Sequence, residues 1–172
     1  MRLPADSTLV ILDAPDALLP EETAANVEAL LAAWREQSLP IVHVRRDADA
    51  AAPPSGAWTA APPAAAAESV IARSAGSAFE DSDLEALLDA LGATTLVVCG
   101  ALGHDALGAT VRDGLDRGFR IFVVAGACWP AEETNAWSLA ALADGEARVV
   151  SVASTLAAAA TAMSRRRRDE TR

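Results

Sequence analysis

The stretch TLVVCGALGHDALGATVRDGLDRGFRIFVV, residues 95–124, decides the fold class of this chain. It opens with an apolar, β-branched run at Thr95–Cys99 and ends inside a second run at Arg120–Ala125, and both runs predict buried strands. The residues between them, His104–Arg117, have a helical pattern. Two apolar strands joined by a helix predict a parallel pair, because a crossover helix brings the chain back to the same edge of the sheet.

The same alternation of strands and helices continues on both sides of this unit. Further strands are predicted at Thr8–Leu12, Pro40–Val44, Ser69–Ala72 and Arg148–Val152, and further helices at Glu21–Gln37, Asp81–Leu91, Glu132–Leu142 and Thr155–Met163. We therefore expect an α/β protein with a three-layer α/β/α architecture, a six-stranded parallel sheet and Rossmann-like topology. The predicted domain spans residues 1–163, and residues 164–172 form a basic, polar tail in which Arg165–Arg168 is a solvated run.

Length and charge limit the classes of function. The 172 residues are enough for one domain with a substantial core. The net charge of −10 argues against nucleic-acid binding, because phosphates would be repelled over most of the surface.

No stretch has the length and apolarity of a membrane span, and Asp6 and Asp13 interrupt the N-terminal apolar run, which argues against a signal peptide. We expect a cytoplasmic protein without a membrane partner. The chain has no lysine, which excludes a Schiff base.

The two cysteines, Cys99 and Cys128, predict neither a disulfide nor a metal site. A structural disulfide is not expected in a reducing compartment. Cys99 lies in an apolar run and fits a small buried hydrophobe, whereas Cys128 follows the fifth predicted strand and could approach a pocket. Two cysteines and two histidines at these spacings form no zinc motif, so we expect no metal and no cofactor.

One long segment, Asp47–Ala67, breaks the regular alternation. It is rich in alanine and proline and is too long for a simple turn. It is either a pocket cover that carries Trp58 or a tolerated insertion, and both interpretations stay open.

Candidate site residues follow the predicted strands, because ligands of open parallel sheets bind outside the carboxyl ends of the strands. Asp13 follows the first strand and could be an acid or base, or a turn residue. Arg73 follows the third strand and could bind a carboxylate through two parallel hydrogen bonds, or be solvated.

The segment Cys99–Ala106 joins the fourth strand to its helix, so its amides could bind an anion or oxyanion. His104 is the only titratable ring there and is either a capping or a catalytic residue. His43 lies inside a predicted strand and is expected in the core. No serine or cysteine stands beside His104 at helix-N-terminal spacing, so no nucleophilic triad forms locally.

Several sequence elements occur together in the order and spacing of a known superfamily. They are Arg73-x-x-x-Ser77-Ala78-Phe79, Asp83-Leu84, Leu96–Gly100, Thr110 with Arg112-Asp113, and Gly118–Val124. As a set, over residues 8–156, they resemble the isochorismatase-like cysteine hydrolases, which include nicotinamidases and N-carbamoylsarcosine amidases. The resemblance implies the fold expected above, a pocket for a small anionic or amide-like molecule, and a homodimer or larger homo-oligomer.

The resemblance also implies three catalytic positions, which the family fills with aspartate, lysine and cysteine and this chain with Asp13, Arg73 and Ala106. Arginine keeps the positive charge but is bulkier than lysine. Alanine has no nucleophile, so the thioester chemistry of amide hydrolysis cannot occur at that position. Pro15 stands where the family usually has glutamine. The implied binding residues are Trp58, Phe79, Ala101 and Leu102, with a strained cis peptide expected at Ala101–Leu102.

Three functions are compatible with this pattern. The first is a degenerate family member that keeps the fold and an anion pocket without hydrolysis, because two of three catalytic positions have changed. The second is a cysteine-independent hydrolase that resembles true isochorismatases, which have a small residue at the cysteine position and a histidine two residues before it, here His104. Asp13 would then be the general acid and Arg73 would hold a substrate carboxylate. The third is a scaffold or assembly protein.

Overall fold

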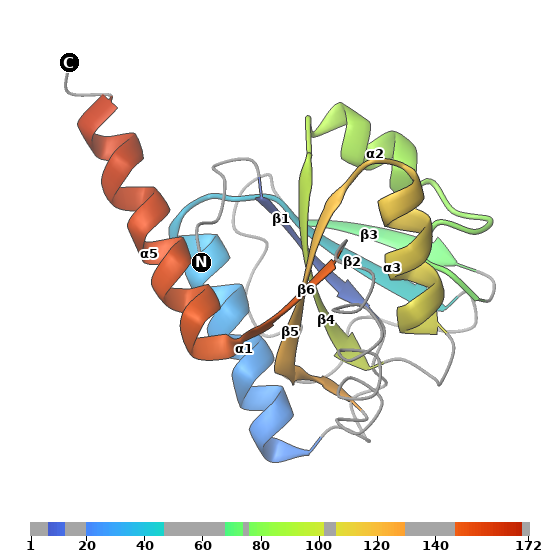
Figure 1. Cartoon of the computed structure of the whole chain (residues 1–172), viewed down its shortest axis with the longest axis horizontal. Coiled ribbons are helices and arrows are strands. Elements are labelled where there is room, and N and C mark those ends of the chain that lie inside the picture. The colour runs from blue at the N-terminus through green and yellow to red at the C-terminus, as the bar shows by residue number, and fades with distance from the viewer. Residues whose placement is uncertain are drawn as a thin grey trace.

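The strands form one six-stranded sheet in the computed structural model, which describes residues 7–12, 20–46, 68–73, 76–101, 106–129 and 147–169. They are β1 (Ser7–Leu12), β2 (Ile41–Arg46), β3 (Glu68–Arg73), β4 (Thr95–Ala101), β5 (Arg120–Trp129) and β6 (Ala147–Ser151). Their order across the sheet is β3-β2-β1-β4-β5-β6, and every neighbouring pair is parallel (Figure 1). All six predicted strands and the parallel sheet are confirmed.

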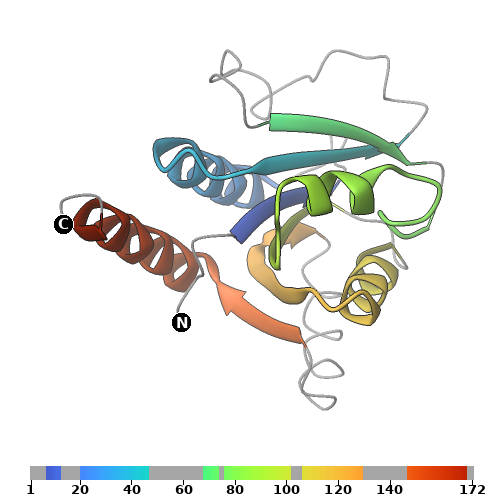
Figure 2. The same cartoon turned by 90° about the horizontal axis from the view of Figure 1, so that it is seen from above.

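Helices cover both faces of the sheet. On one face lie α1 (Glu21–Glu36) and α5 (Val152–Asp169), and on the other lie α2 (Leu84–Ala90) and α3 (Ala106–Asp116) (Figure 2). This arrangement confirms the predicted three-layer α/β/α architecture. The predicted helix at 132–142 and the segment 47–67 lie outside the described residues.

The start of α2 differs from the prediction. The helix begins at Leu84 rather than Asp81, because Asp81 has a positive φ of 48° and cannot belong to a right-handed helix. The N-cap residue is Asp83, and the preceding Ser82 hydroxyl accepts the Leu84 N–H at 3.3 Å and donates to the Ala78 carbonyl at 2.5 Å. The turn and the helix start are therefore held by one side chain.

The last helix is longer than predicted. It starts at Val152 instead of Thr155 and ends at Asp169 instead of Met163. No glycine or proline lies between residues 152 and 169, and alanine and arginine are good helix formers. Part of the predicted tail is therefore helical. No helix within the described ranges combines the length and apolarity that crossing a membrane requires.

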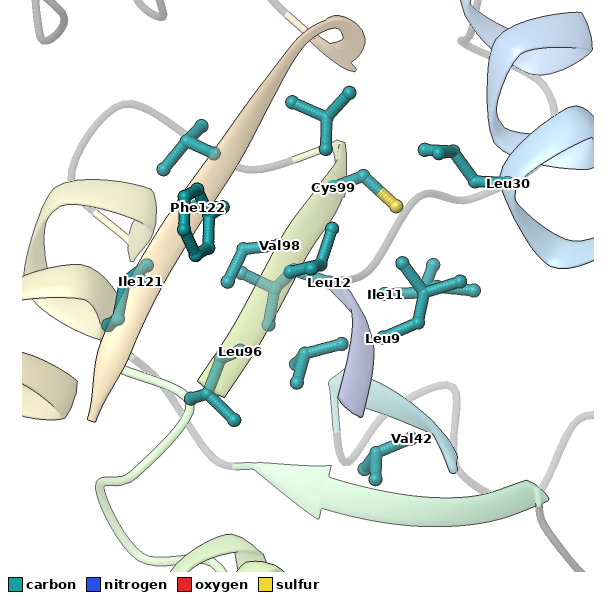
Figure 3. Packing of buried hydrophobic residues seen from close by; sticks show 14 of the residues in the cluster. Leu9, Ile11, Leu12, Leu30, Val42, Leu96, Val98, Cys99, Ile121 and Phe122 are labelled. Carbon is teal, nitrogen blue, oxygen red and sulfur yellow. The ribbon is translucent and has the colours of Figure 1, made fainter. Parts of the chain in front are cut away.

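The core lies on both faces of the central strands. Leu9, Ile11 and Leu12 of β1 are at most 3% exposed, and they pack with residues of β4, β5 and α1 (Figure 3). Trp34 of α1 is completely buried, and its indole N–H donates to the Ser7 carbonyl at 3.2 Å. This bond joins α1 to the start of β1, so the central strand is held from its first residue.

Candidate functional site

The candidate site lies where the strand order reverses, between β1 and β4. From β1 the chain adds β2 and β3 on one side, and it later adds β5 and β6 beyond β4 on the other. Ligands of doubly wound sheets bind at the carboxyl ends of the strands at such a reversal. Leu12 and Gly100 are register partners at this edge, and α3 begins five residues after Ala101.

Gly100 brings the ends of β1 and β4 into close contact. Its φ is +120°, and a Cβ at this position would lie 1.9 Å from the Leu12 carbonyl oxygen. Only glycine can occupy such a position, because both the backbone angle and the approach exclude a side chain. The two strand ends therefore form one wall of the site.

Four of the predicted site residues lie outside the described ranges. They are Asp13, Trp58, Leu102 and His104. In the chain, Asp13 directly follows Leu12 at the end of β1, and residues 102–105 connect Ala101 to Ala106. Their roles stay predictions. Ala101 is the last residue of β4 and pairs with Trp129 of β5.

Arg73 is a buried cation at the carboxyl edge of the sheet. It is the last residue of β3, it is 3% exposed, and its Nη1 donates to the Gly76 carbonyl at 2.9 Å. The alternative of a solvated arginine is therefore wrong. Two strand spacings separate β3 from β1, which is about 10 Å. Arg73 therefore lies at the same edge of the sheet as the other candidate positions, but to one side of the point where β1 and β4 meet.

Ala106 is the first residue of α3 and is 8% exposed. The amides of the first helical turn point toward the carboxyl edge of the sheet, and the helix dipole makes this end partly positive. A nucleophile at this position would be activated by the dipole. The methyl group that stands there offers no such chemistry.

Phe79 lies away from this edge. Its ring stacks on Phe119 with centroids 5.9 Å apart, and the Arg117 guanidinium lies 4.9 Å from its centre. A Cβ on Gly114 of α3 would lie 3.2 Å from the ring. Gly114 follows Ala106 by about 12 Å along the helix axis. These contacts correct the implied binding role: the described surroundings of Phe79 are the core at the far end of α3.

The structure brings two sequence elements of the resemblance together. The Ala78 N–H donates to the Thr110 hydroxyl of α3 at 2.8 Å, and the Ser77 hydroxyl accepts the Phe79 N–H at 3.1 Å. Ser77 and Thr110 are both 2% exposed. Residues 77–79 are thus fixed on α3.

Both cysteines are buried in the sheet. Cys99 of β4 is confirmed as a buried residue, and burial, followed by the nearby Cys128 thiol, raises the pKa of Cys99 well above its ordinary value. Cys128 was expected after the fifth strand but belongs to β5, where it is 2% exposed with its sulfur 3.9 Å from the Val98 carbonyl. Neither thiol lies at the start of α3.

Strand β5 contains a bulge that the sequence pattern did not predict. Val123 pairs with Val98 and Cys128 pairs with Gly100, so four residues of β5, 124–127, lie opposite the single residue Cys99. The bulge carries Trp129 to the carboxyl edge beside Ala101. The glycine at position 126, inside an apolar run, was the available signal, since such glycines mark bulges.

A second missed feature is a charged cluster on the α1 side of the sheet. Arg35 of α1 donates to both carboxylate oxygens of Glu68 in β3, and His43 Nε2 of β2 lies 3.2 Å from Glu68 Oε2. The hydrogen bond from Arg35 lowers the pKa of Glu68, whereas burial lowers the pKa of His43. His43 is 7% exposed, so it is buried as predicted but has an acidic partner. In the described ranges, no three His, Cys, Asp or Glu side chains are placed to hold a metal ion.

Comparison with known proteins identifies the relatives of this fold. Residues 9–154 match the isochorismatase domain family. The chain is 28% identical to the secreted isochorismatase effector Isc1 of Verticillium dahliae, over 69% of this chain and 70% of that protein. It is 34% identical to the streptothricin hydrolase of Streptomyces noursei, over 56% of this chain but only 37% of that protein. An isochorismatase from Pseudomonas putida has a similar structure, with a TM-score of 0.67, 28% identity, and coverage of 87% and 90% of the two chains.

Proposed function

Because this chain belongs to the isochorismatase family, we propose that it keeps a hydrolase-type pocket for a small anionic or amide-like molecule but performs no thiol-dependent hydrolysis. The observation that carries the proposal is Ala106 at the first position of α3. This is the position where the resemblance implies the nucleophilic cysteine. A methyl group cannot attack a carbonyl carbon, so no acyl-enzyme can form there.

The two cysteines of the chain do not replace the missing nucleophile. Cys99 and Cys128 are at most 2% exposed and lie within β4 and β5. A thiol must ionise to act as a nucleophile, and burial keeps Cys99 in its neutral form by raising its pKa. The burial of both thiols supports the proposal that no thiol-dependent hydrolysis takes place.

Arg73 supports binding of an anion. A guanidinium that is 3% exposed is stable only with good hydrogen bonding or a negative partner, and the Gly76 carbonyl supplies one of these bonds. A ligand carboxylate at this edge would add a charge-assisted interaction. Arginine in place of lysine would favour binding over chemistry, because it does not release a proton near neutral pH.

The names of the relatives favour a hydrolase-type pocket. One similar protein is named an isochorismatase effector and another a streptothricin hydrolase. The two names refer to different compounds. We therefore propose a class of small-molecule ligand rather than one compound. We also propose a cytoplasmic location, which cell fractionation would check, and a homo-oligomer, which light scattering would check.

A cysteine-independent hydrolase is the second candidate, favoured by the contact between Gly100 and Leu12. Leu12 of β1 directly precedes Asp13 in the chain, and Gly100 of β4 precedes the segment that contains His104. The contact therefore joins the two strand ends that lead to these candidate residues. Asp13 would protonate the terminal carbon of a vinyl ether, and His104 would orient the substrate or the water that adds to the resulting oxocarbenium carbon, after which the hemiketal releases the alcohol.

Hydrolysis and binding assays separate the two candidates. Wild type, Asp13→Asn and the exposed control Asp116→Asn would be assayed with isochorismate and nicotinamide for turnover, and with nicotinate for binding by calorimetry. Binding without turnover supports the proposed function. Turnover that Asp13→Asn abolishes and Asp116→Asn preserves supports the second candidate. Turnover that survives Asp13→Asn contradicts both.

A further inference from the structure

We infer that the outer surface of α1 and α5 is an interface between two copies of this chain, in which the basic end of α5 of each copy contacts the acidic helix α1 of the other. The inference rests on the homo-oligomer included in the proposed function, for which it names the surface. It does not depend on the ligand of the pocket.

Charge is divided unevenly along the chain. Five of the 14 arginines lie in residues 165–172, whereas 22 of the 24 acidic residues precede them. Four of these arginines are consecutive, at Arg165–Arg168, and they lie at the end of α5, which finishes at Asp169. We call these four residues the basic turn. A basic turn on an otherwise acidic molecule is attracted to the acidic surface of a second copy.

Helices α1 and α5 run side by side in the same direction (Figures 1 and 2). Their relative level is fixed at Gly126 of β5. The Asn26 side-chain N–H donates to the Gly126 carbonyl at 2.8 Å, and a Cβ on Gly126 would lie 3.7 Å from Val152 Cγ2. Val152, the first residue of α5, therefore lies level with Asn26 in the first half of α1.

The basic turn extends beyond the end of α1. With a rise of about 1.5 Å per residue, α1 ends at Glu36 about 15 Å past the level of Asn26, whereas the basic turn lies about 20–24 Å past the same level. Figure 1 shows this overhang of α5. Glu28 is about 16 Å or more from the basic turn along the helix axis. The two charged regions of one copy therefore do not meet each other.

Helix α1 presents negative charge that is not neutralised within the described part of the chain. Glu21, Glu22, Glu28 and Glu36 are exposed, and none of them forms an ion pair with a described residue. Arg35 is the one basic residue of this helix, and it is bound to the carboxylate of β3. The surface of α1 is therefore complementary in charge to the basic turn.

Small side chains cover the surface between these two charged regions. Ala25 and Ala32 of α1 are exposed, as are Ala153, Ala157 and Ala160 of α5. The residues of each set are three, four or seven positions apart, so each set lies on one face of its helix. Alanines let a second helix approach closely. The charges at the two ends then select the partner and its direction.

A two-fold arrangement satisfies both copies at once. If two α5 helices cross antiparallel near Ala157 and Ala160, the basic turn of each copy lies level with Glu22 and Glu28 of the other. The contact then occurs twice and closes at two copies. An anionic lipid surface would attract the basic turn but repel the rest of this acidic chain, so a second copy is the favoured occupant.

A charge swap between two variants tests the inference. The first variant carries Glu22→Arg and Glu28→Arg, which reverse the charge of α1. The second changes the basic turn to glutamates, with R165E, R166E, R167E and R168E. Sedimentation velocity should find the wild type as a dimer whose dissociation constant rises about ten-fold from low to high salt.

Each variant alone should be monomeric, because like charges would face each other across the interface. An equimolar mixture of the two should dimerise again, because every contact then joins opposite charges. Recovery in the mixture also requires both variants to be folded. Glu36→Gln is the matched control, since it removes an exposed glutamate at the other end of α1, and it should leave the dimer unchanged.

The outcomes separate this interface from the proposed function. Recovery of the dimer in the mixture supports the inference. A monomeric wild type overturns it together with the homo-oligomer, whereas an oligomer that neither variant weakens overturns this interface alone. A monomer whose basic turn binds vesicles of phosphatidylcholine and phosphatidylserine overturns the second copy as the occupant. The pocket is tested separately by nicotinate binding.

Discussion

Both carboxylate oxygens of Glu68 accept hydrogen bonds from Arg35, one from Nε at 2.6 Å and one from Nη2 at 3.0 Å. The two side chains are 17% and 20% exposed, and they connect the end of α1 to the start of the edge strand β3. His43 of β2 shares the same carboxylate. Because β3 ends at Arg73, the cluster fixes the strand that carries the buried cation of the candidate site.

Glu68→Gln should lower the free energy of unfolding by about 1–2 kcal/mol, because the amide cannot accept two charge-assisted bonds from Arg35. Urea unfolding followed by circular dichroism would measure the loss. The control is Glu85→Gln, which removes the carboxylate from the more exposed pair with Arg117 and should have little effect. Equal losses in the two variants would contradict a special role for the buried cluster.

Stability should fall as the pH decreases below 6.5. Burial holds the pKa of His43 below its ordinary value of 6.5, so the unfolded chain takes up a proton that the folded chain resists. The contribution of His43 is complete above pH 6.5 and is lost as the pH falls toward its folded pKa. The lowered pKa of Glu68 adds a second loss below its ordinary value of 4.5. Urea midpoints at pH 5, 6 and 7.5 would show the first loss, and His43→Gln should flatten it.

Gly100→Ala should destabilise the protein by about 3 kcal/mol or more, since the new methyl group would meet the Leu12 carbonyl as well as an unfavourable φ. Gly92→Ala is the matched control. Gly92 also has a positive φ, of +64°, but nothing lies within 4 Å of its Cβ position, so only the backbone strain of about 1 kcal/mol applies. Thermal unfolding would compare the two. A milder effect at position 100 than at 92 would refute the close approach of β1 and β4.

A thiol introduced by Ala106→Cys should react faster with iodoacetamide than either native cysteine. The helix N-terminus lowers the pKa of a thiol at position 106, whereas burial raises the pKa of Cys99. Mass spectrometry of the folded variant should therefore find the label at position 106 first. Unfolding in urea should make all three cysteines reactive, which controls for reagent quality. Preferential labelling of Cys99 or Cys128 in the folded protein would count against their burial.

Much of the fold could be predicted because the strands are locally encoded. Runs such as Thr95–Cys99 are continuously apolar and are separated by amphipathic helices, which is typical of parallel sheets covered on both faces. The helix ends were less predictable. The positive φ of Asp81 keeps this residue out of α2, and the apolar pattern of the sequence does not reveal that angle.

The candidate site was predicted only in part. Arg73 could be named as a candidate because it follows a predicted strand, and Ala106 because the resemblance implies a catalytic position there; their roles in a site stay predictions. Gly126–Trp129 was placed after the fifth predicted strand, but the pairing of Trp129 with Ala101 depends on the bulge and could not be predicted. Glu68 was missed because its partners come from two other elements. Phe79 was misplaced because the resemblance gives a position in the sequence and no direction for the side chain.

The sequence by itself determined the alternation of strands and helices, the absence of lysine, and the alanine at the start of α3, because these are properties of residues and of their nearest neighbours in the chain. The tertiary structure alone decided that Gly100 meets Leu12, that Asn26 holds Gly126, and that Glu68 joins Arg35 to His43. Each of these contacts links residues distant in sequence, and the order and register of the strands, which local patterns do not encode, determine which of them meet.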